Sequence, residues 1–190
     1  MRNFRFLAAS FIAFMLLALQ GCQGPEGLPG PQGPQGPEGP PGPNIFPAVF
    51  EVGNVNFLAS ADYRVSITMP GNLEVLPSDV VLTYILWDEV EVNGSLTDLW
   101  RLLPQIVPSG NGFFQYNYDF TQYDVEVFMN GTVNLSTLDN SWTRNQVLRV
   151  VVVPADFLNG RVAPVDYNNY EEVIKAFDID DSNVLKLSAN

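Results

Sequence analysis

Beyond residue 45, apolar and polar residues alternate with a period of two along much of the chain, which is typical of β-strands with one buried face. One alternating stretch ends at Pro70-Gly71-Asn72 and is apolar at every second position: Tyr63, Val65, Ile67 and Met69. Residues 80–87 and 147–153 are instead apolar on both faces. We therefore expect each of these two runs to form a buried strand inside a sheet.

The most aromatic segment spans residues 113–128. One face carries Phe114, Tyr116, Tyr118 and Phe120, and the alternation continues in the opposite phase at Tyr123, Val125, Val127 and Met129. The change of phase indicates either a two-residue link at Thr121-Gln122, which would set Phe120 opposite Tyr123, or a bulge in one long bent strand. Aromatic residues at this period are most often the core of a sheet, and the alternative is a platform that stacks a sugar or a peptide.

Two Asn-Gly pairs lie between alternating segments, and this dipeptide is the strongest short-range signal for a hairpin turn. A turn at Asn93-Gly94 would bring three pairs together: Val92 with Ser95, Glu89 with Asp98, and Trp87 with Trp100 on one face. A turn at Asn130-Gly131 would pair Met129 with Thr132 and Phe128 with Val133.

Helical periodicity occurs near the end of the chain. Tyr170, Val173, Ile174 and Phe177 follow the spacing i, i+3, i+4 and i+7, behind asparagines and with two glutamates in the first turn. Residues 45–190 are therefore expected to form one mainly β domain. We predict an antiparallel β-sandwich, jelly-roll or immunoglobulin-like, with one short C-terminal helix.

A strict Gly-x-y repeat occupies residues 24–44, and each triplet contains proline. Its seven glycines are Gly24, Gly27, Gly30, Gly33, Gly36, Gly39 and Gly42. Only glycine fits the crowded axis of three wound polyproline-II chains, so the repeat predicts a collagen-like stalk that reaches roughly 65 Å when extended. The expected assembly is a homotrimer, and the alternative is a semi-rigid spacer made of a single chain.

Arg2 and Arg5 precede an apolar run over residues 6–19. A run of this length is too short to span a membrane and has the proportions of a secretory signal, so residues 1–21 are expected to be a helical signal peptide. The run ends in Leu19-Gln20-Gly21-Cys22, which resembles the lipobox of bacterial lipoproteins. That resemblance implies cleavage between Gly21 and Cys22, acyl chains on Cys22, and residues 22–23 as a lipidated N-terminus. The alternative is a soluble secreted protein with a free thiol.

The composition excludes several kinds of partner and catalytic site. The chain has 9 basic and 21 acidic residues, a net charge of −12, which repels nucleic acid and anionic head groups. It has no histidine and a single cysteine, which excludes Ser-His and Cys-His nucleophiles, the common zinc sites and any disulfide within one chain. We therefore expect no cofactor and no nucleic-acid partner.

Two acidic clusters are candidates for cation binding. Asp178, Asp180 and Asp181 offer oxygen ligands at a spacing that suits calcium, but the segment lacks the glycine and the glutamate of an EF-hand loop. The second cluster is Asp88-Glu89-x-Glu91 with Asp98. A solvated acidic surface is the commoner explanation of both, and we expect no metal site.

The order of leader, lipobox cysteine, Gly-x-y run and compact domain resembles small collagen-like lipoproteins of Gram-negative bacteria. The resemblance implies a lipid-anchored protein of the cell envelope, in the outer membrane or at the cell surface, held in the membrane by the acyl chains on Cys22. We expect the C-terminal domain to be a non-enzymatic adhesion or binding module for an extracellular glycan or protein. The alternatives are a structural trimeric tether and, more remotely, a carboxylate-dependent hydrolase.

Overall fold

The computed structural model describes residues 48–71, 73–155 and 164–189. The chain divides into two units, Met1–Gly42 and Pro43–Asn190, and every described residue belongs to the second. The predictions for the signal peptide, for Cys22 and for the Gly-x-y repeat therefore lie outside the described residues.

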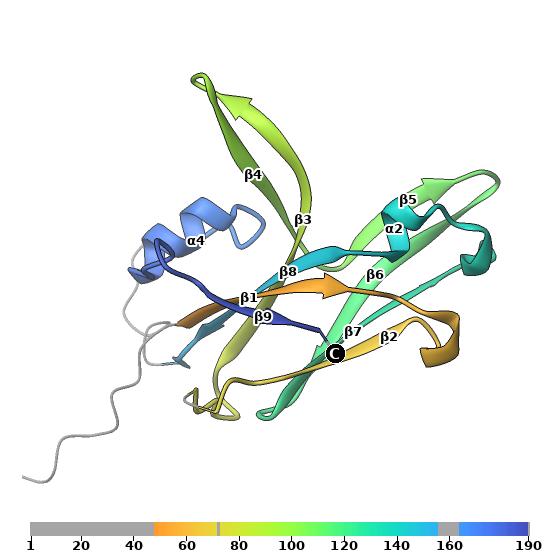
Figure 1. Cartoon of the computed structure of the whole chain (residues 1–190). Helices are drawn as coiled ribbons and strands as arrows, with labels where there is room; N and C mark the ends of the chain where they lie inside the picture. The colour runs from red at the N-terminus through yellow and green to blue at the C-terminus, as the bar shows by residue number, and fades with distance from the viewer. Residues whose placement is uncertain (1–47, 72, 156–163, 190) are drawn as a thin grey trace, which may run out of the picture. The chain divides into compact units, whose positions relative to one another are not determined.

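The second unit is mainly β and contains two sheets (Figure 1). Sheet A has five strands in the order β4-β3-β8-β1-β9, and sheet B has four in the order β2-β7-β6-β5. The strands are β1 (Ala48–Val55), β2 (Arg64–Thr68), β3 (Val80–Val92), β4 (Ser95–Leu102), β5 (Gln105–Ser109), β6 (Gly112–Phe120), β7 (Asp124–Gly131), β8 (Gln146–Val153) and β9 (Leu185–Ser188). The helical elements are η1 (Ala59–Ala61), η2 (Leu135–Thr137), α2 (Asn140–Thr143) and α4 (Tyr170–Phe177). The predicted mainly β domain is confirmed, and the expected antiparallel pairing holds except between β1 and β9, which are parallel.

Each sheet gives one face to a shared core. From sheet A this core takes Phe50, Val52, Val81, Ile85, Leu148, Val150 and Val152, and from sheet B it takes Ile67, Phe114, Tyr116, Val125, Val127 and Met129. The aromatic face predicted over residues 113–128 is therefore mainly core. Towards its far end the face leaves the core, because Phe120 is 46% exposed and Tyr123 is 70% exposed.

The other face of sheet A is covered by α4. Leu82, Tyr84, Val151 and Val153 of the sheet form a second core with Tyr170, Val173, Ile174 and Phe177 of the helix. Since sheet A is covered on both faces, β3 and β8 are apolar at successive positions, as predicted for residues 80–87 and 147–153. The predicted helix is confirmed: Asn169 caps its N-terminus, and Asp178 ends it in the left-handed conformation with φ of 52°.

The hairpin at Asn93-Gly94 is confirmed, with positive φ at both residues. Val92 pairs with Ser95 and Glu89 with Asp98, as predicted. The far part of this β3–β4 hairpin projects away from the rest of the domain (Figure 1).

The predicted pairing of Trp87 with Trp100 is wrong. Leu86 pairs with Trp100 and Asp88 with Leu99, so Trp87 lies in a β-bulge. A shift of one residue moves a side chain to the opposite face of the sheet. Trp100 consequently belongs to the core beneath α4, whereas Trp87 packs against the core between the sheets and contacts Trp142.

The predicted hairpin at Asn130-Gly131 is wrong as well. Both residues continue β7 and pair with β6, where Asn130 lies opposite Gln115 and Gly131 opposite Phe114. Gly131 is needed for space, because a Cβ atom there would lie 2.3 Å from the carbonyl oxygen of Phe113. The dipeptide thus marks a close approach of two backbones and not a turn.

The link between β6 and β7 is a hairpin, as predicted, so the alternative of one long bent strand is wrong. It is longer than the expected two residues, because Phe120 pairs with Val125 and residues 121–123 connect the strands. The side chain of Thr121 holds this connection by accepting hydrogen bonds from the backbone N–H groups of Tyr123 and Asp124. Thr-Gln is poor turn chemistry for two residues, but the threonine hydroxyl suits a longer loop.

Candidate functional site

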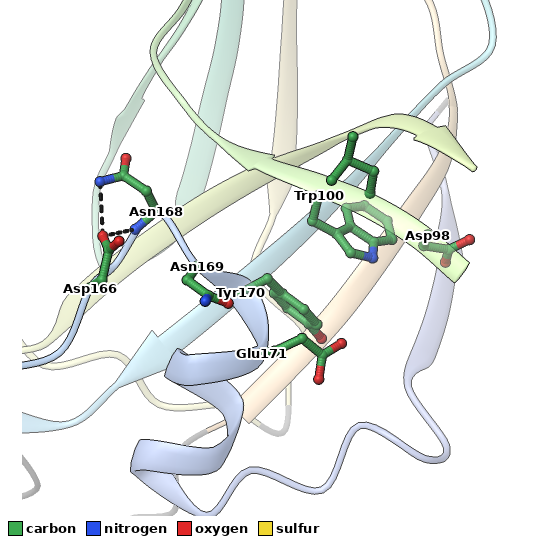
Figure 2. A pocket seen from close by; sticks show the side chains of 8 residues that line it. Asp98, Trp100, Asp166, Asn168, Asn169, Tyr170 and Glu171 are labelled. Carbon is green, nitrogen blue, oxygen red and sulfur yellow. Dashed lines mark hydrogen bonds between the residues drawn. The ribbon is translucent and has the colours of Figure 1, made fainter. Parts of the chain in front are cut away.

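A pocket of about 360 Å³ lies between β4 and the N-terminal end of α4 (Figure 2). Its lining combines two aromatic residues with carboxylates and amides: Asp98, Leu99, Trp100, Asp166, Asn168, Asn169, Tyr170 and Glu171. A volume of this size is within the range of sites that bind small molecules. Because the pocket joins a strand to a helix about 70 residues further along the chain, sequence spacing does not reveal it.

The turn before α4 forms one wall of the pocket and is held by its own polar side chains. Asp166 accepts hydrogen bonds from the backbone N–H and from the side-chain amide of Asn168, both at 3.0 Å. The side-chain oxygen of Asn169 accepts from the backbone N–H of Glu172 at 3.2 Å and so caps the helix. These bonds leave the oxygen of the Asn168 side chain and the nitrogen of the Asn169 side chain for other partners.

Trp100 and Tyr170 form the inner wall, with ring centres 5.9 Å apart. Both residues are almost fully buried, Trp100 at 7% exposure and Tyr170 at 4%. Tyr170 also packs edge to face against Tyr84, at 5.3 Å. The indole N–H of Trp100 makes no hydrogen bond to any residue that the structure describes, and Figure 2 shows its nitrogen on the edge of the ring that faces the other lining side chains.

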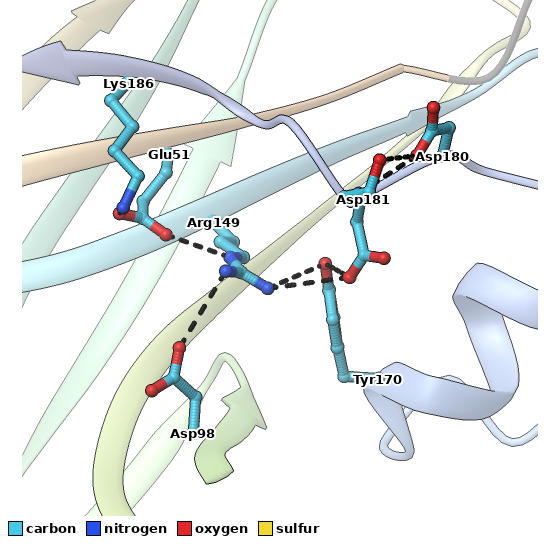
Figure 3. Close-up of polar contacts among 8 residues, drawn as sticks. Glu51, Asp98, Arg149, Tyr170, Asp180, Asp181 and Lys186 are labelled. Atoms are coloured by element: carbon cyan, nitrogen blue, oxygen red, sulfur yellow. Dashed lines mark hydrogen bonds and ion pairs between the residues drawn. The ribbon is translucent and has the colours of Figure 1, made fainter. Parts of the chain in front are cut away.

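Behind this wall, Arg149 joins four side chains from different parts of the chain (Figure 3). Its Nε donates to the Glu51 carboxylate at 3.1 Å, and its Nη1 donates to the Tyr170 hydroxyl at 3.0 Å. It also forms ion pairs with Asp98 at 3.8 Å and with Asp181 at 3.7 Å. The guanidinium group stacks over Trp100, 4.3 Å from the ring centre, so Arg149 fixes the position of the aromatic wall.

Protonation states follow from this network. Burial raises the pKa of the Tyr170 hydroxyl, and the nearby Asp181 carboxylate raises it further, while the Arg149 charge opposes them. Tyr170 is therefore protonated at neutral pH and donates its hydrogen to Asp181 at 3.0 Å. Burial disfavours the charge of Arg149, but its hydrogen-bonded partners Tyr170 and Glu51 raise the pKa of the guanidinium overall.

The three aspartates considered for calcium do not converge. Asp178 ends α4, Asp180 accepts hydrogen bonds from the backbone and the hydroxyl of Ser182, and Asp181 turns to Arg149. The hydrogen bonds from Ser182 lower the pKa of the Asp180 carboxyl. Within residues 48–71, 73–155 and 164–189, no three acidic, histidine or cysteine side chains are placed to hold a metal ion.

The second acidic cluster is divided between the exposed hairpin and the pocket. Glu89 faces Asp98 across the hairpin, as predicted, and Asp88 accepts a hydrogen bond from the backbone N–H of Glu89 at 2.9 Å. Asp98 turns to Arg149 and lines the pocket. One of these four acids therefore belongs to the candidate site.

Sequence reasoning missed the rest of the site, including Arg149, Asp166 and Glu171. A signal for Arg149 was present, since it is the one charged residue in the apolar run 147–153. A charge inside a buried strand needs partners, and here it has Glu51 across the strand pair. No comparable signal exists for the pocket residues of the turn before α4.

Comparison with protein-family models, with curated proteins and with solved structures found no match for this chain. In the part of the chain that the structure covers, no helix is both long and apolar enough to cross a membrane.

Proposed function

We propose that this protein is a lipid-anchored, collagen-like protein of a bacterial cell envelope whose C-terminal domain binds an extracellular ligand and catalyses no reaction. The observation that carries the binding role is the pocket between β4 and α4, where buried aromatic rings meet polar side chains with free hydrogen-bonding groups. Convergence of a few polar groups on a preformed hollow is typical of ligand sites. In this proposal the two sheets form a β-sandwich head of the jelly-roll or immunoglobulin-like type.

The N-terminal sequence supports the anchored location. The leader over residues 1–21, Cys22 and the adjacent Gly-x-y run have the order expected of a collagen-like lipoprotein. More than one acyl chain on Cys22 gives stable membrane attachment, and the stalk over residues 24–44 holds the head away from the lipid. This order favours the outer membrane or the cell surface of a Gram-negative bacterium.

A second candidate function is a trimeric tether with no ligand of its own. The strict period of seven glycines favours it, because a single-chain spacer would tolerate other residues at those positions. The two functions are compatible if three heads share one stalk. Three linked heads would then bind a multivalent ligand with a higher avidity than the affinity of one head.

The test of the proposal uses the full chain produced in a Gram-negative host and purified in detergent. We expect it to bind a component of a glycan or matrix-protein array, and to turn over none of a panel of glycoside and ester substrates. Absence of binding on both arrays would leave the tether as the function, and turnover would revive the hydrolase.

The anchor is tested in cells with Cys22→Ser. Cleavage and acylation both require the thiol, so the variant should remain as an uncleaved precursor. Normal processing and membrane retention of the variant would contradict the lipobox. Light scattering on the purified full chain then separates a trimer from a single-chain spacer.

A further inference from the structure

Resting on the proposed binding function, we infer that the pocket between β4 and α4 takes a neutral, hydroxyl-rich ligand, namely a saccharide unit, and not a cation or an anion. The charge of the lining, its free donors and acceptors, and the contacts of its aromatic rings all favour this class of ligand.

The charge of the lining excludes anions. Asp98, Asp166 and Glu171 bring three carboxylates to the rim, and none of the lining residues is basic. The one guanidinium nearby, Arg149, is already paired with Glu51, Asp98 and Asp181. An acidic ligand would therefore meet like charges without compensation.

The free hydrogen-bonding groups require a ligand that both donates and accepts. The indole N–H of Trp100 and the side-chain nitrogen of Asn169 are donors without a partner among the described residues. The Glu171 carboxylate and the side-chain oxygen of Asn168 are acceptors that the turn leaves free. A hydroxyl group donates and accepts at once, whereas an ammonium group only donates and would leave the Trp100 N–H unsatisfied.

The aromatic rings do not form a cage for a cation. One face of Trp100 is covered by the Arg149 guanidinium, 4.3 Å from the ring centre, and Tyr170 packs against both Tyr84 and Trp100. A cation needs an open ring face within about 6 Å. These contacts already occupy the aromatic rings, so the ligand is held by hydrogen bonds that alternate between donors and acceptors, an arrangement that suits neighbouring hydroxyl groups of a sugar.

The experiment uses the full chain in detergent on an array of neutral and acidic glycans, followed by calorimetry with the neutral oligosaccharide that gives the strongest signal. Trp100→Phe should weaken that binding about tenfold because it removes a hydrogen-bond donor. Glu171→Gln should weaken it by a similar factor, because a charged acceptor that makes a strong hydrogen bond is replaced by a neutral amide. Asp178→Asn is the matched control, since it removes the same charge at the other end of α4 and keeps a residue that tolerates the left-handed conformation. Circular dichroism checks that each variant is folded. If Trp100→Phe does not fold, the binding measured with Glu171→Gln alone tests the inference, because Glu171 is exposed and its replacement leaves the core unchanged.

Salt separates a neutral ligand from a charged one. Raising the ionic strength from about 0.1 M to about 1 M shortens the Debye length from about 10 Å to about 3 Å, and binding of a neutral saccharide should change little. Binding of amines that is lost in high salt, or equal saccharide binding by Glu171→Gln and the unmodified protein, would overturn the inference and leave the binding module standing. If the chain binds a matrix protein and no saccharide, the inference is likewise overturned and the binding function stands. If it binds neither, both the inference and the proposed binding function are wrong.

Discussion

The guanidinium group of Arg149 on β8 lies 4.3 Å from the centre of the Trp100 ring on β4, with β3 between the two strands. The same arginine contacts α4 through Tyr170 and the segment after α4 through Asp181. One side chain thus connects three parts of the chain that sequence places far apart, and the pocket wall depends on it.

Replacing Arg149 with alanine should reduce the free energy of unfolding by about 2 kcal/mol, because the Glu51 carboxylate, 11% exposed, would lose its hydrogen bond from Arg149 and keep only the exposed Lys186 as an ion-pair partner. Urea denaturation measures the change. Arg64→Ala is the control, since Arg64 pairs with Glu126 at a surface where both side chains are about 40% exposed, and its loss should cost less than about 1 kcal/mol. Equal losses in the two variants would contradict the role given to Arg149.

Stability should fall as the pH rises above about 10, the ordinary pKa of tyrosine. Burial raises the pKa of three tyrosines: Tyr84, Tyr116 and Tyr170. The hydroxyl of Tyr84 donates to the backbone carbonyl of Tyr167, and that of Tyr116 to the backbone carbonyl of Trp142. The hydroxyl of Tyr170 donates to the Asp181 carboxylate. The unfolded chain therefore releases these protons at a lower pH than the folded chain. The stabilising contribution is complete below about pH 10 and is lost above it, at about 1.4 kcal/mol per pH unit for each tyrosine.

Urea denaturation at a series of pH values, together with tyrosinate absorbance, tests this dependence. Tyr84→Phe should reduce the slope by about 1.4 kcal/mol per pH unit, since one of the buried phenols no longer titrates. A free energy of unfolding that stays constant through about pH 11 would contradict the prediction.

Gly94→Ala should destabilise the β3–β4 hairpin by about 1 kcal/mol, because Gly94 has φ of 82°. Gly71→Ala is the matched control: a Cβ atom added at either glycine would meet no other atom within 4 Å, but Gly71 has no positive φ. Hydrogen exchange of the β3 and β4 amides reports the local effect. Equal protection in the two variants would show that backbone conformation at Gly94 is not limiting.

Thr83→Val should raise the free energy of unfolding by about 1 kcal/mol. Thr83 is fully buried on β3, and among the described residues its hydroxyl is the one buried side-chain oxygen without a hydrogen-bond partner. The same substitution at Thr121, whose hydroxyl accepts from two backbone N–H groups, should instead lower stability by about 1 kcal/mol. Thermal denaturation of both variants checks the opposite signs.

The sequence was sufficient where periodicity and burial coincide. The buried strands β3 and β8, the helix α4 and the Asn93-Gly94 turn follow from local pattern, because each depends on residues close together in the chain. The bulge at Trp87 could not be predicted, since it depends on how β4 packs beneath α4. The turn predicted at Asn130-Gly131 was wrong for a related reason. Gly131 is required because the backbone of Phe113 lies too close for a side chain, and only the structure shows this contact.

The candidate site was largely beyond the sequence for the same physical reason. Of the acids singled out, Asp98 and Asp181 reach the Arg149 network. Asp178 ends α4, and the Asp180 carboxylate accepts local hydrogen bonds from Ser182. Whether an acid contacts Arg149 depends on the pairing of distant strands, which the local pattern of charges does not predict.

The position of β1 in sheet A has a mechanical consequence. Tension on the chain that precedes Ala48 would enter the domain along β1, which is held by β8 on one side and by β9 on the other. A pull along the strand loads the hydrogen bonds of both ladders at once, so that they share the force. From β1 the load crosses β8 and β3 before it reaches β4 and the pocket. If the domain is anchored and binds a ligand as proposed, the strand order of sheet A is the path along which it would bear the drag of that ligand.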